Sequence, residues 1–215
     1  MADRAARAAA APQDDPRDAA RRAAAAPLFI AAVADLRAVL DRLGDDHRDA
    51  VLDLATDVLA AWRQGGRFLL CGNGGSAADA QHVAAELVGR FQAERPAYAA
   101  LALTTDTSIL TSVGNDYGYL HVFARQVQAL GRPGDVLLVI STSGNSANCV
   151  EAVAAARAQG LRVHGFLGGD GGRLRGLVDG ALVVPSANTA KIQEIHITMG
   201  HLLCMVLETW MRDDA

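Results

Sequence analysis

Short apolar runs alternate with helical patterns along the chain from Arg67 onward. Five runs have the length of β-strands and few polar residues: Arg67–Cys71, Ala99–Leu103, Val136–Ile140, Arg162–Phe166 and Gly180–Val184. Helical spacing of apolar residues lies between and after them: Ala77–Phe91, Tyr119–Leu130, Asn148–Gln159 and Thr189–Met211. Apolar strands without alternation, each followed by a crossover helix, predict a parallel sheet covered on both faces. A ligand is expected at the carboxyl ends of such strands, where the loops gather.

Two more helices are predicted ahead of the sheet. Apolar residues recur at helical spacing between residues 27 and 43, and Gly44 ends this first helix. Asp45 or Asp46 can then cap a second helix that reaches Trp62. Both helices have broad apolar stripes, which indicates that they pack on the domain and also on another subunit.

The first 26 residues differ in composition from the rest of the chain. Half of them are alanine, and acids at Asp14, Asp15 and Asp18 stand where a secretory signal would need an apolar stretch. We therefore expect residues 1–26 to form a flexible tail. Residues 27–215 are expected to form a single domain, because their number suits one hydrophobic core.

The composition of the chain argues against several classes of function. All but one of the 20 basic residues are arginine, so a Schiff-base lysine would have to be Lys191, and no phosphate-loop motif G-x-x-x-x-G-K-[ST] is present. A net charge of -4 gives no basic surface for nucleic acid or anionic lipid, and no apolar run is expected to reach the roughly 20 residues of a membrane span. Nucleic acid and membrane are therefore not expected partners. Cys71, Cys149 and Cys204 are too scattered for a disulfide framework and fit a reducing compartment.

Two predicted strands end in loops rich in hydrogen-bond donors, each directly before a helix. The first loop, residues 71–76 (C-G-N-G-G-S), has glycines whose backbone N–H groups a ligand can approach, and Ser76 can cap the helix or donate its hydroxyl. With Ala77 it matches the dinucleotide pattern G-x-G-x-x-A, but Asp106 lies too far on for the usual ribose contact. The second loop, residues 141–146 (S-T-S-G-N-S), offers hydroxyls at a helix N-terminus without positive charge, which suits a phosphate monoester. Either loop alone also fits a tight turn, but one ligand spanning both would be a sugar phosphate.

Four polar side chains on two predicted helices have a spacing that places them on one helix face. His82 and Glu86 are four residues apart and Gln193 and His201 are eight apart, so each pair shares a face with apolar neighbours. If the two helices face each other, two imidazoles, a carboxylate and an amide oxygen can hold a divalent metal such as zinc. The same residues can instead supply a general base, Glu86, and a general acid, His201. Periodicity does not show that the helices converge, and a lone helical histidine is more often structural.

Weaker candidates lie outside these motifs. Asn115 and Asp116, in an expected loop, can bind a substrate hydroxyl or can form a turn. Of the other histidines, His164 lies within a strand, and His196 lies on a different face of its helix from His201.

These motifs, in this order, resemble the phosphoheptose isomerase family of the sugar isomerase (SIS) domain superfamily. The resemblance covers the chain from about Phe29 to Trp210. It implies an SIS-type three-layer α/β/α sandwich with a five-stranded parallel sheet, preceded by two N-terminal helices. It also implies a cytoplasmic homotetramer with active sites at subunit interfaces. The implied reaction is the isomerisation of sedoheptulose 7-phosphate to D-glycero-D-manno-heptose 7-phosphate through a cis-enediol, the first step of heptose synthesis for bacterial surface glycans such as lipopolysaccharide.

The family's functional positions carry over to matching residues of this chain. The resemblance implies that one zinc ion per subunit is held by His82, Glu86, Gln193 and His201. It implies catalytic roles for Glu86 as base and His201 as proton shuttle. The substrate-binding positions it implies are Asn73, Gly74, Gly75, Ser76, Glu86, Asn115, Asp116, Ser141, Thr142, Ser143, Ser146 and Gln193. A carboxylate bound tightly to a metal is a poorer base, so the metal contact is either loose or partly structural.

Two other functions fit the same motifs. One is a non-catalytic relative that binds the bacterial replication initiator, which the segment Arg90–Pro96 also resembles. Such relatives tend to lose catalytic positions, whereas Glu86 and His201 are both present here. The other is an isomerase of a different ketose phosphate, which the same four residues would serve.

Overall fold

A computed structural model describes residues 15–213, and the chain divides into two units after Ala38. The unit from Val39 onward contains a single five-stranded sheet with the order β2-β1-β3-β4-β5, in which every neighbouring pair is parallel. Its strands are β1 (Phe68–Gly72), β2 (Ala100–Ala102), β3 (Val136–Ser141), β4 (Arg162–Gly168) and β5 (Gly180–Val184). The expected parallel sheet is confirmed, with strand ends that differ by at most two residues from the predicted ones.

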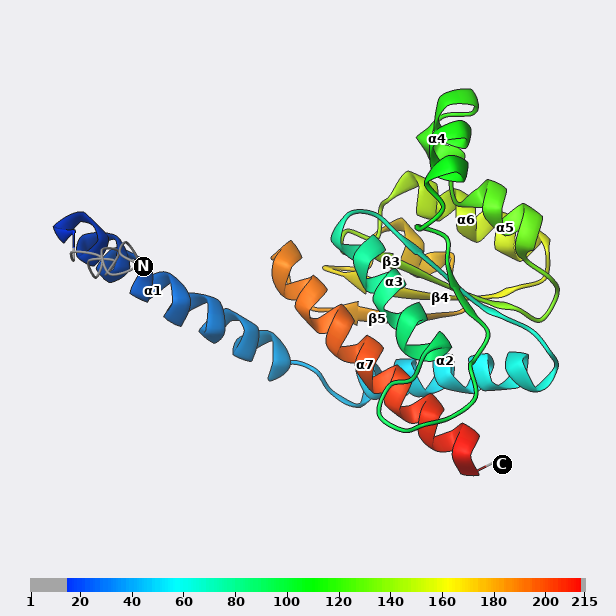
Figure 1. The fold of residues 1–215 in the computed structure, drawn as a ribbon, viewed down its shortest axis with the longest axis horizontal. Helices are drawn as coiled ribbons and strands as arrows, with labels where there is room; N and C mark the ends of the chain where they lie inside the picture. Colours follow the sequence, from blue (N-terminus) through cyan, green and yellow to red (C-terminus); the bar gives the residue numbers. More distant parts are fainter. Residues whose placement is uncertain (1–14, 214–215) are drawn as a thin grey trace, which may run out of the picture. The chain divides into compact units, whose positions relative to one another are not determined.

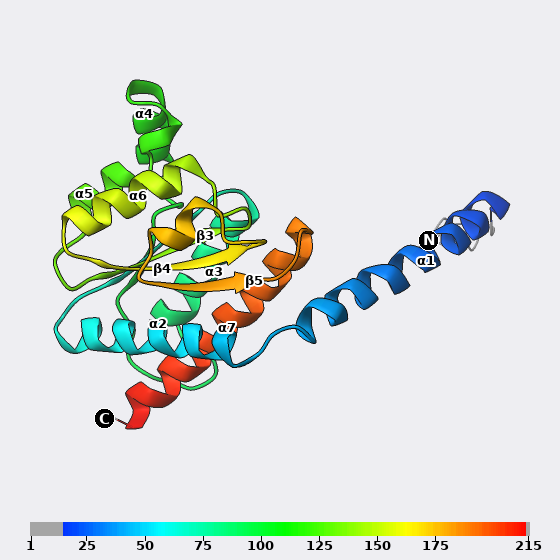
Figure 2. The same cartoon turned by 180° about the vertical axis from the view of Figure 1, so that it is seen from behind.

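Helices cover both faces of this sheet. They are α2 (Asp45–Arg63), α3 (Gly75–Val88), α4 (Thr107–Asp116), α5 (Ala124–Leu130), α6 (Ala147–Ala158) and α7 (Thr189–Asp213), with short 3₁₀ helices η1 (Tyr119–His121) and η2 (Arg173–Gly176). Figures 1 and 2 show α5 and α6 on one face and α2, α3 and α7 on the other. The unit is therefore the three-layer α/β/α sandwich that the sequence predicted.

The core lies on both sides of the central strands. Alternate strand residues such as Leu69, Leu137 and Val163 pack with the apolar faces of α5 and α6 in one cluster. On the other face the ring of Phe166 lies 5.9 Å from the ring of His196 on α7. Every residue of β1 and β3 is buried, because a strand with helices on both faces has no solvent side. The three cysteines are buried and free.

Helix α1 (Pro16–Leu40) begins well before the expected start at residue 27. It runs through Pro27, although proline removes one helical hydrogen bond, and the alanines on both sides have the highest helix propensity of any residue. The expected 26-residue tail therefore contributes its last residues to this helix, while residues 1–14 lie outside the described part. The expected first helix also ended three residues later, at residue 43.

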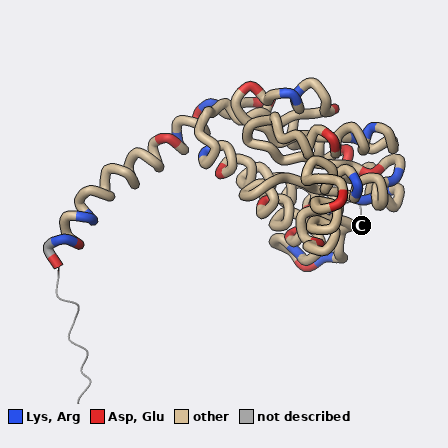
Figure 3. Tube along the Cα trace, turned by 90° about the horizontal axis from the view of Figure 1, so that it is seen from above, with Lys and Arg blue, Asp and Glu red and all other residues tan. Residues whose placement is uncertain are grey.

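The composition of α1 overturns one expectation. The segment Arg17–Leu40 is long and apolar enough, by length and composition, to cross a membrane. The alanines make this possible without a run of large apolar residues. Figure 3 shows the long uncharged stretch between Arg22 and Asp35 and, from Val39 onward, acidic and basic residues interspersed along the chain.

Three local predictions were wrong. Gly44, not Asp45 or Asp46, is the N-cap of α2, and its N–H donates to Nδ1 of His47 in the first turn. The expected helix Tyr119–Leu130 is broken into η1 and α5. The segment after β2 was expected to be a loop, but it forms α4, a helix without a fully buried residue, whose Leu110 and Val113 pack against the core partly buried.

Candidate active site

Side chains of α3 and α7 converge where these two helices lie side by side on one face of the sheet (Figures 1 and 2). Nε2 of His82 lies 2.9 Å from Nε2 of His201, within hydrogen-bond distance, and 3.3 Å from Oε1 of Glu86. One ligand atom from each of the three residues lies within 4.8 Å of the others. The carboxylate of Glu86 is 25% exposed and the imidazole of His82 is 47% exposed, so the group is open to a ligand. The convergence that periodicity alone left open is present.

Close packing of the two helices brings these residues together. A Cβ at Gly200 would lie 2.8 Å from Cγ2 of Val83, so glycine in the middle of α7 lets the helix backbones approach. The ring of Phe91, in the segment after α3, stacks on His201 with centroids 5.6 Å apart and 22° between planes. Phe91 was expected to end a helix rather than to contact the site, because sequence spacing does not relate a loop residue to a distant helix.

Gln193 lies on the α7 face that carries His201, two turns earlier, and contacts the first loop. A Cβ at Gly75 would lie 2.5 Å from both Nε2 and Oε1 of its amide, so a larger residue there would force the amide of Gln193 to shift. Nε2 of Gln193 donates to Oδ1 of Asp79 at 3.3 Å. This bond fixes the amide so that its oxygen remains available as a ligand. Burial raises the pKa of Asp79, although the hydrogen bond from Gln193 acts in the opposite direction.

The donor set fits a divalent metal. Tetrahedral zinc with bonds near 2.0–2.1 Å places neighbouring ligand atoms about 3.3 Å apart. The His82–His201 and His82–Glu86 separations of 2.9 and 3.3 Å are close to that value. Two imidazoles and a carboxylate are usual zinc ligands, and the amide oxygen of Gln193 is a weaker fourth candidate, oriented by the hydrogen bond that its Nε2 donates to Asp79.

The first loop is held by an amide pair at the start of α3. The side chains of Asn73 and Asn148 exchange two hydrogen bonds, of 2.9 and 2.8 Å, and the hydroxyl of Tyr119 donates to Oδ1 of Asn73. Gly74 takes the N-cap position and Ser76 is the buried second residue of the helix, so of the two roles open to Ser76, capping α3 or donating its hydroxyl, the structure excludes capping. A cleft of about 400 Å³ opens here, lined by Asn73, Tyr119, Leu120, Ser146, Ala147 and Asn148. Asn148 was not predicted, because it lies inside α6, beyond the loop motif.

The second loop is folded back on itself at the start of α6. The hydroxyls of Ser141 and Ser146 lie 2.9 Å apart, and the backbone N–H of Asn145 donates to Oγ of Ser143. Gly144 has a φ of +63°, and a Cβ there would overlap the carbonyl oxygen of Gly171. The loop therefore packs directly on the segment after β4. Its hydroxyls are gathered at one helix N-terminus, as the sequence predicted.

Two expected contributors lie elsewhere. Asn115 and Asp116 are exposed at the end of α4, where Nδ2 of Asn115 donates to Oδ1 of Asp116 at 2.7 Å. Figure 1 shows α4 projecting from the rest of the sheet-bearing unit, so these residues are not gathered with His82, Glu86 and His201. The ammonium of Lys191 forms an ion pair at 2.9 Å with Glu194, three residues later on the same helix.

The match to a family model establishes the class of protein. The SIS domain model matches residues 33–168, more than half of the chain. This assigns strands β1 to β4 and the donor-rich loops after β1 and β3 to an SIS domain. The fold class and the resemblance expected from the sequence are both confirmed.

Individual relatives narrow the class. A phosphoheptose isomerase of Roseiflexus sp. (strain RS-1) is 58% identical over 158 residues, covering 74% of this chain and 80% of that protein. A phosphoheptose isomerase of Pelobacter propionicus is 54% identical over 172 residues, covering 80% of this chain and 91% of that protein. The structure of phosphoheptose isomerase GmhA from Neisseria gonorrhoeae is similar with a TM-score of 0.77 and 44% identity, over 87% of this chain and 98% of that one. The chain belongs to the phosphoheptose isomerase family of SIS-domain proteins.

Proposed function

We propose that the protein is an aldose–ketose isomerase that converts sedoheptulose 7-phosphate to D-glycero-D-manno-heptose 7-phosphate. The observation that carries the proposal is the convergence of His82, Glu86 and His201 on α3 and α7, two helices whose first turns meet where Gln193 contacts Gly75 of the first donor-rich loop. The relatives named phosphoheptose isomerase support the same reaction. A regulator without activity would not require a carboxylate and two imidazoles in contact.

We assign to the carboxylate of Glu86 the transfer of the proton that leaves carbon C1 and is returned to carbon C2. It takes a proton from C1 of the ketose while the carbonyl oxygen on C2 gains one, which gives a cis-enediol. It then returns a proton to C2 while the oxygen on C1 loses one, which leaves the aldehyde at C1. Oε1 of Glu86 faces His82, so we assign the transfer to Oε2.

We assign to His201 the proton transfers at the two substrate oxygens, those on C1 and C2. The ring nitrogen that is not bound to the metal can donate a proton to the oxygen on C2 and then accept one from the oxygen on C1. Phe91 stacks on the ring and fixes its plane. This orientation matters because proton transfer requires hydrogen-bond geometry between the two heavy atoms.

Zinc is the metal we propose for the site, held by His82, Glu86, Gln193 and His201. When bound, it supplies Lewis-acid stabilisation of negative charge on the substrate oxygens. The hydroxyls of Ser141, Thr142, Ser143 and Ser146, at the start of α6, are proposed to bind the phosphate, since a helix N-terminus favours a dianion without a lysine. Asn73, Gly74, Gly75 and Ser76 are proposed to bind the sugar end.

We further propose a cytoplasmic homotetramer whose subunits complete each other's sites. Large apolar side chains of α1 are exposed, including Leu28 at 71%, Phe29 at 72% and Ile30 at 67%, and such a surface commonly marks a protein interface. Asn115 and Asp116 on the projecting α4 are then substrate contacts of a neighbouring subunit's site. Sedimentation of the full chain as a four-chain assembly without detergent supports this; aggregation that only detergent relieves would favour membrane association of α1.

Proton NMR of the purified protein with sedoheptulose 7-phosphate in deuterated water tests the reaction. An aldoheptose 7-phosphate anomeric signal with deuterium at C2 is expected, because Glu86 exchanges its proton with solvent. Glu86→Gln is expected to lower turnover by about 10²–10⁴-fold, the usual contribution of a general base, while substrate still raises the melting temperature. Wild-type turnover in this variant would remove Glu86 from the mechanism. If the wild-type protein, assayed with and without added zinc, gives no aldose, another ketose phosphate or a non-catalytic role takes the place of this reaction.

A further inference from the structure

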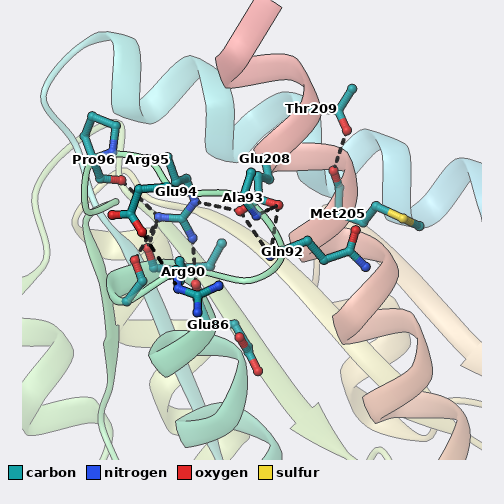
Figure 4. Close-up of polar contacts among 12 residues, drawn as sticks. Glu86, Arg90, Gln92, Ala93, Glu94, Arg95, Pro96, Met205, Glu208 and Thr209 are labelled. Carbon is teal, nitrogen blue, oxygen red and sulfur yellow. Dashed lines mark hydrogen bonds and ion pairs between the residues drawn. The ribbon is translucent and has the colours of Figure 1, made fainter.

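A buried ion pair joins the segment after α3 to α7. Nε of Arg95 lies 3.1 Å from Oε1 of Glu208, and the two side chains are only 6% and 10% exposed. Figure 4 shows the two side chains pointing toward one another, with Glu208 on α7 and Arg95 in the loop beside α3. Removing two charges from water is costly, so a pair at this depth must be stabilised by further hydrogen bonds.

Arg95 uses its remaining donors on the last turn of α3. Nη2 donates to the carbonyl oxygen of Glu86 at 2.6 Å, and Nη1 donates to that of Leu87 at 2.8 Å. Helix-terminal carbonyls have no partner within the helix, and an arginine fork can satisfy two of them in fixed geometry. The guanidinium also lies 4.0 Å above the ring of Tyr98. The backbone of the proposed base is therefore held directly by Arg95.

Glu208 holds the loop that carries Phe91. Its Oε2 accepts hydrogen bonds from the backbone N–H groups of Gln92 and Ala93, each at 3.1 Å. Burial opposes the charged form, but these N–H groups and Arg95 together lower the pKa of Glu208, so the carboxylate is ionised at neutral pH. The peptide next to Phe91 is thereby fixed, and Phe91 stacks on His201.

We propose that Arg95 and Glu208 are positioning residues that hold Glu86 and His201 in register for proton transfer. Glu208 lies seven residues after His201, two turns along the same helix, so the pair connects the element that carries the base to the element that carries the shuttle. Arg95 contacts the backbone of Glu86, and within the described part of the chain neither charged group is hydrogen-bonded to the side chain of His82, Glu86 or His201. This inference rests on the proposed isomerase function, and its effect falls on the chemical step rather than on substrate binding.

Arg95→Lys is the main test because it keeps the charge but loses the fork. A misplacement on the order of 1 Å at a reacting group costs about 10²-fold in rate, so we expect kcat to fall by about 10–100-fold while KM changes less than about twofold. Arg157→Lys is the matched control: its guanidinium pairs with Asp179 at 3.2 Å on the surface, and its kinetics are expected to equal wild type. A folded Arg95→Lys protein with wild-type kcat overturns the proposal.

A second variant and a second readout separate positioning from folding. Arg95→Met/Glu208→Leu replaces the ion pair by apolar side chains, which often preserves or raises stability but removes the bonds to α3 and the loop. In protein labelled with ¹³C at histidine Cε1, we expect the His201 resonance, assigned with His201→Gln, to move in both Arg95 variants, because the Phe91 ring above it moves. An unmoved resonance, or a kcat loss that only follows the folded fraction, overturns the proposal. The resonance needs no turnover, so an inactive wild type would refute the proposed function and still leave positioning testable.

Discussion

The buried histidine of α7 makes the stability of the fold sensitive to mild acid. His196 is 1% exposed, and its Nε2 donates to the carbonyl oxygen of Leu167 at 3.0 Å. Among the described residues its Nδ1 has no hydrogen-bond partner, so a proton added there would be buried without compensation. Burial lowers the pKa of His196 to about 4, although the bond to Leu167 acts in the opposite direction.

The sign of the effect follows from which state binds the proton first. The unfolded chain protonates this histidine near pH 6.5, whereas the folded chain does so only near pH 4. Stability from neutral His196 is therefore complete above pH 6.5 and is lost as the pH falls toward 4. The full loss is about 3 kcal/mol, of which about 2 kcal/mol is lost by pH 5.

His196→Gln is the perturbation that isolates this contribution. Glutamine retains an N–H donor for Leu167 but cannot be protonated, so any constant cost of the substitution is the same at every pH. We expect the difference in unfolding free energy between wild type and variant to change by about 2 kcal/mol between pH 8 and pH 5. Urea titrations followed by circular dichroism, at one fixed protein concentration, measure it. His121→Gln, in η1, controls for the loss of a histidine outside the core.

A constant difference between wild type and His196→Gln over that pH range would refute the reasoning. It would mean that the folded protein accommodates the proton on Nδ1, by water entry or by a local opening around α7. An equal change in His121→Gln would show that the effect is not specific to the core.

Two glycine substitutions test the loops. Gly75→Ala places a Cβ 2.5 Å from the amide of Gln193, which is the end of a flexible side chain. We expect the zinc affinity measured by calorimetry to fall at least tenfold, with a stability loss under about 1 kcal/mol. An unchanged zinc affinity would exclude Gln193 as a ligand. Gly144→Ala, at φ +63° against the backbone of Gly171, is expected to cost about 1–3 kcal/mol of stability by denaturant titration and to weaken inorganic phosphate binding. Unaltered phosphate binding would place the phosphate outside the second loop.

Much of the fold follows from the sequence because its strands are buried on both faces. Continuous apolar runs such as Leu69–Cys71 do not depend on context, and the helices between them are set by period. The errors occur where local chemistry competes with the pattern. Pro27 suggests a helix start, but the surrounding alanines continue the helix, and α4 has no buried residue to mark it. The alanines that continue α1 are themselves part of the local sequence, so of these two cases only α4 requires information on neighbouring segments.

The sequence predicted which residues of each helix share a face, but not that the two helices lie side by side. The spacing of His82 with Glu86, and of Gln193 with His201, follows from the helical period alone. That α3 and α7 meet depends on packing, for which Gly200 in a helix interior was an unused signal. Arg95 and Phe91 have no periodic relation to the site, so only the folded loop reveals them.

Close backbone approaches link the fold to its chemistry. Gly200 lets α7 reach α3 at Val83, and Gly75 leaves the space that the amide of Gln193 occupies. A side chain at either glycine would separate groups that must lie within hydrogen-bond distance of one substrate. The ion pair of Arg95 and Glu208 then holds those two helices at their other ends. The site is thus fixed from both ends of α3 and α7, which is what a reaction that moves one proton between adjacent carbons requires of its base and shuttle.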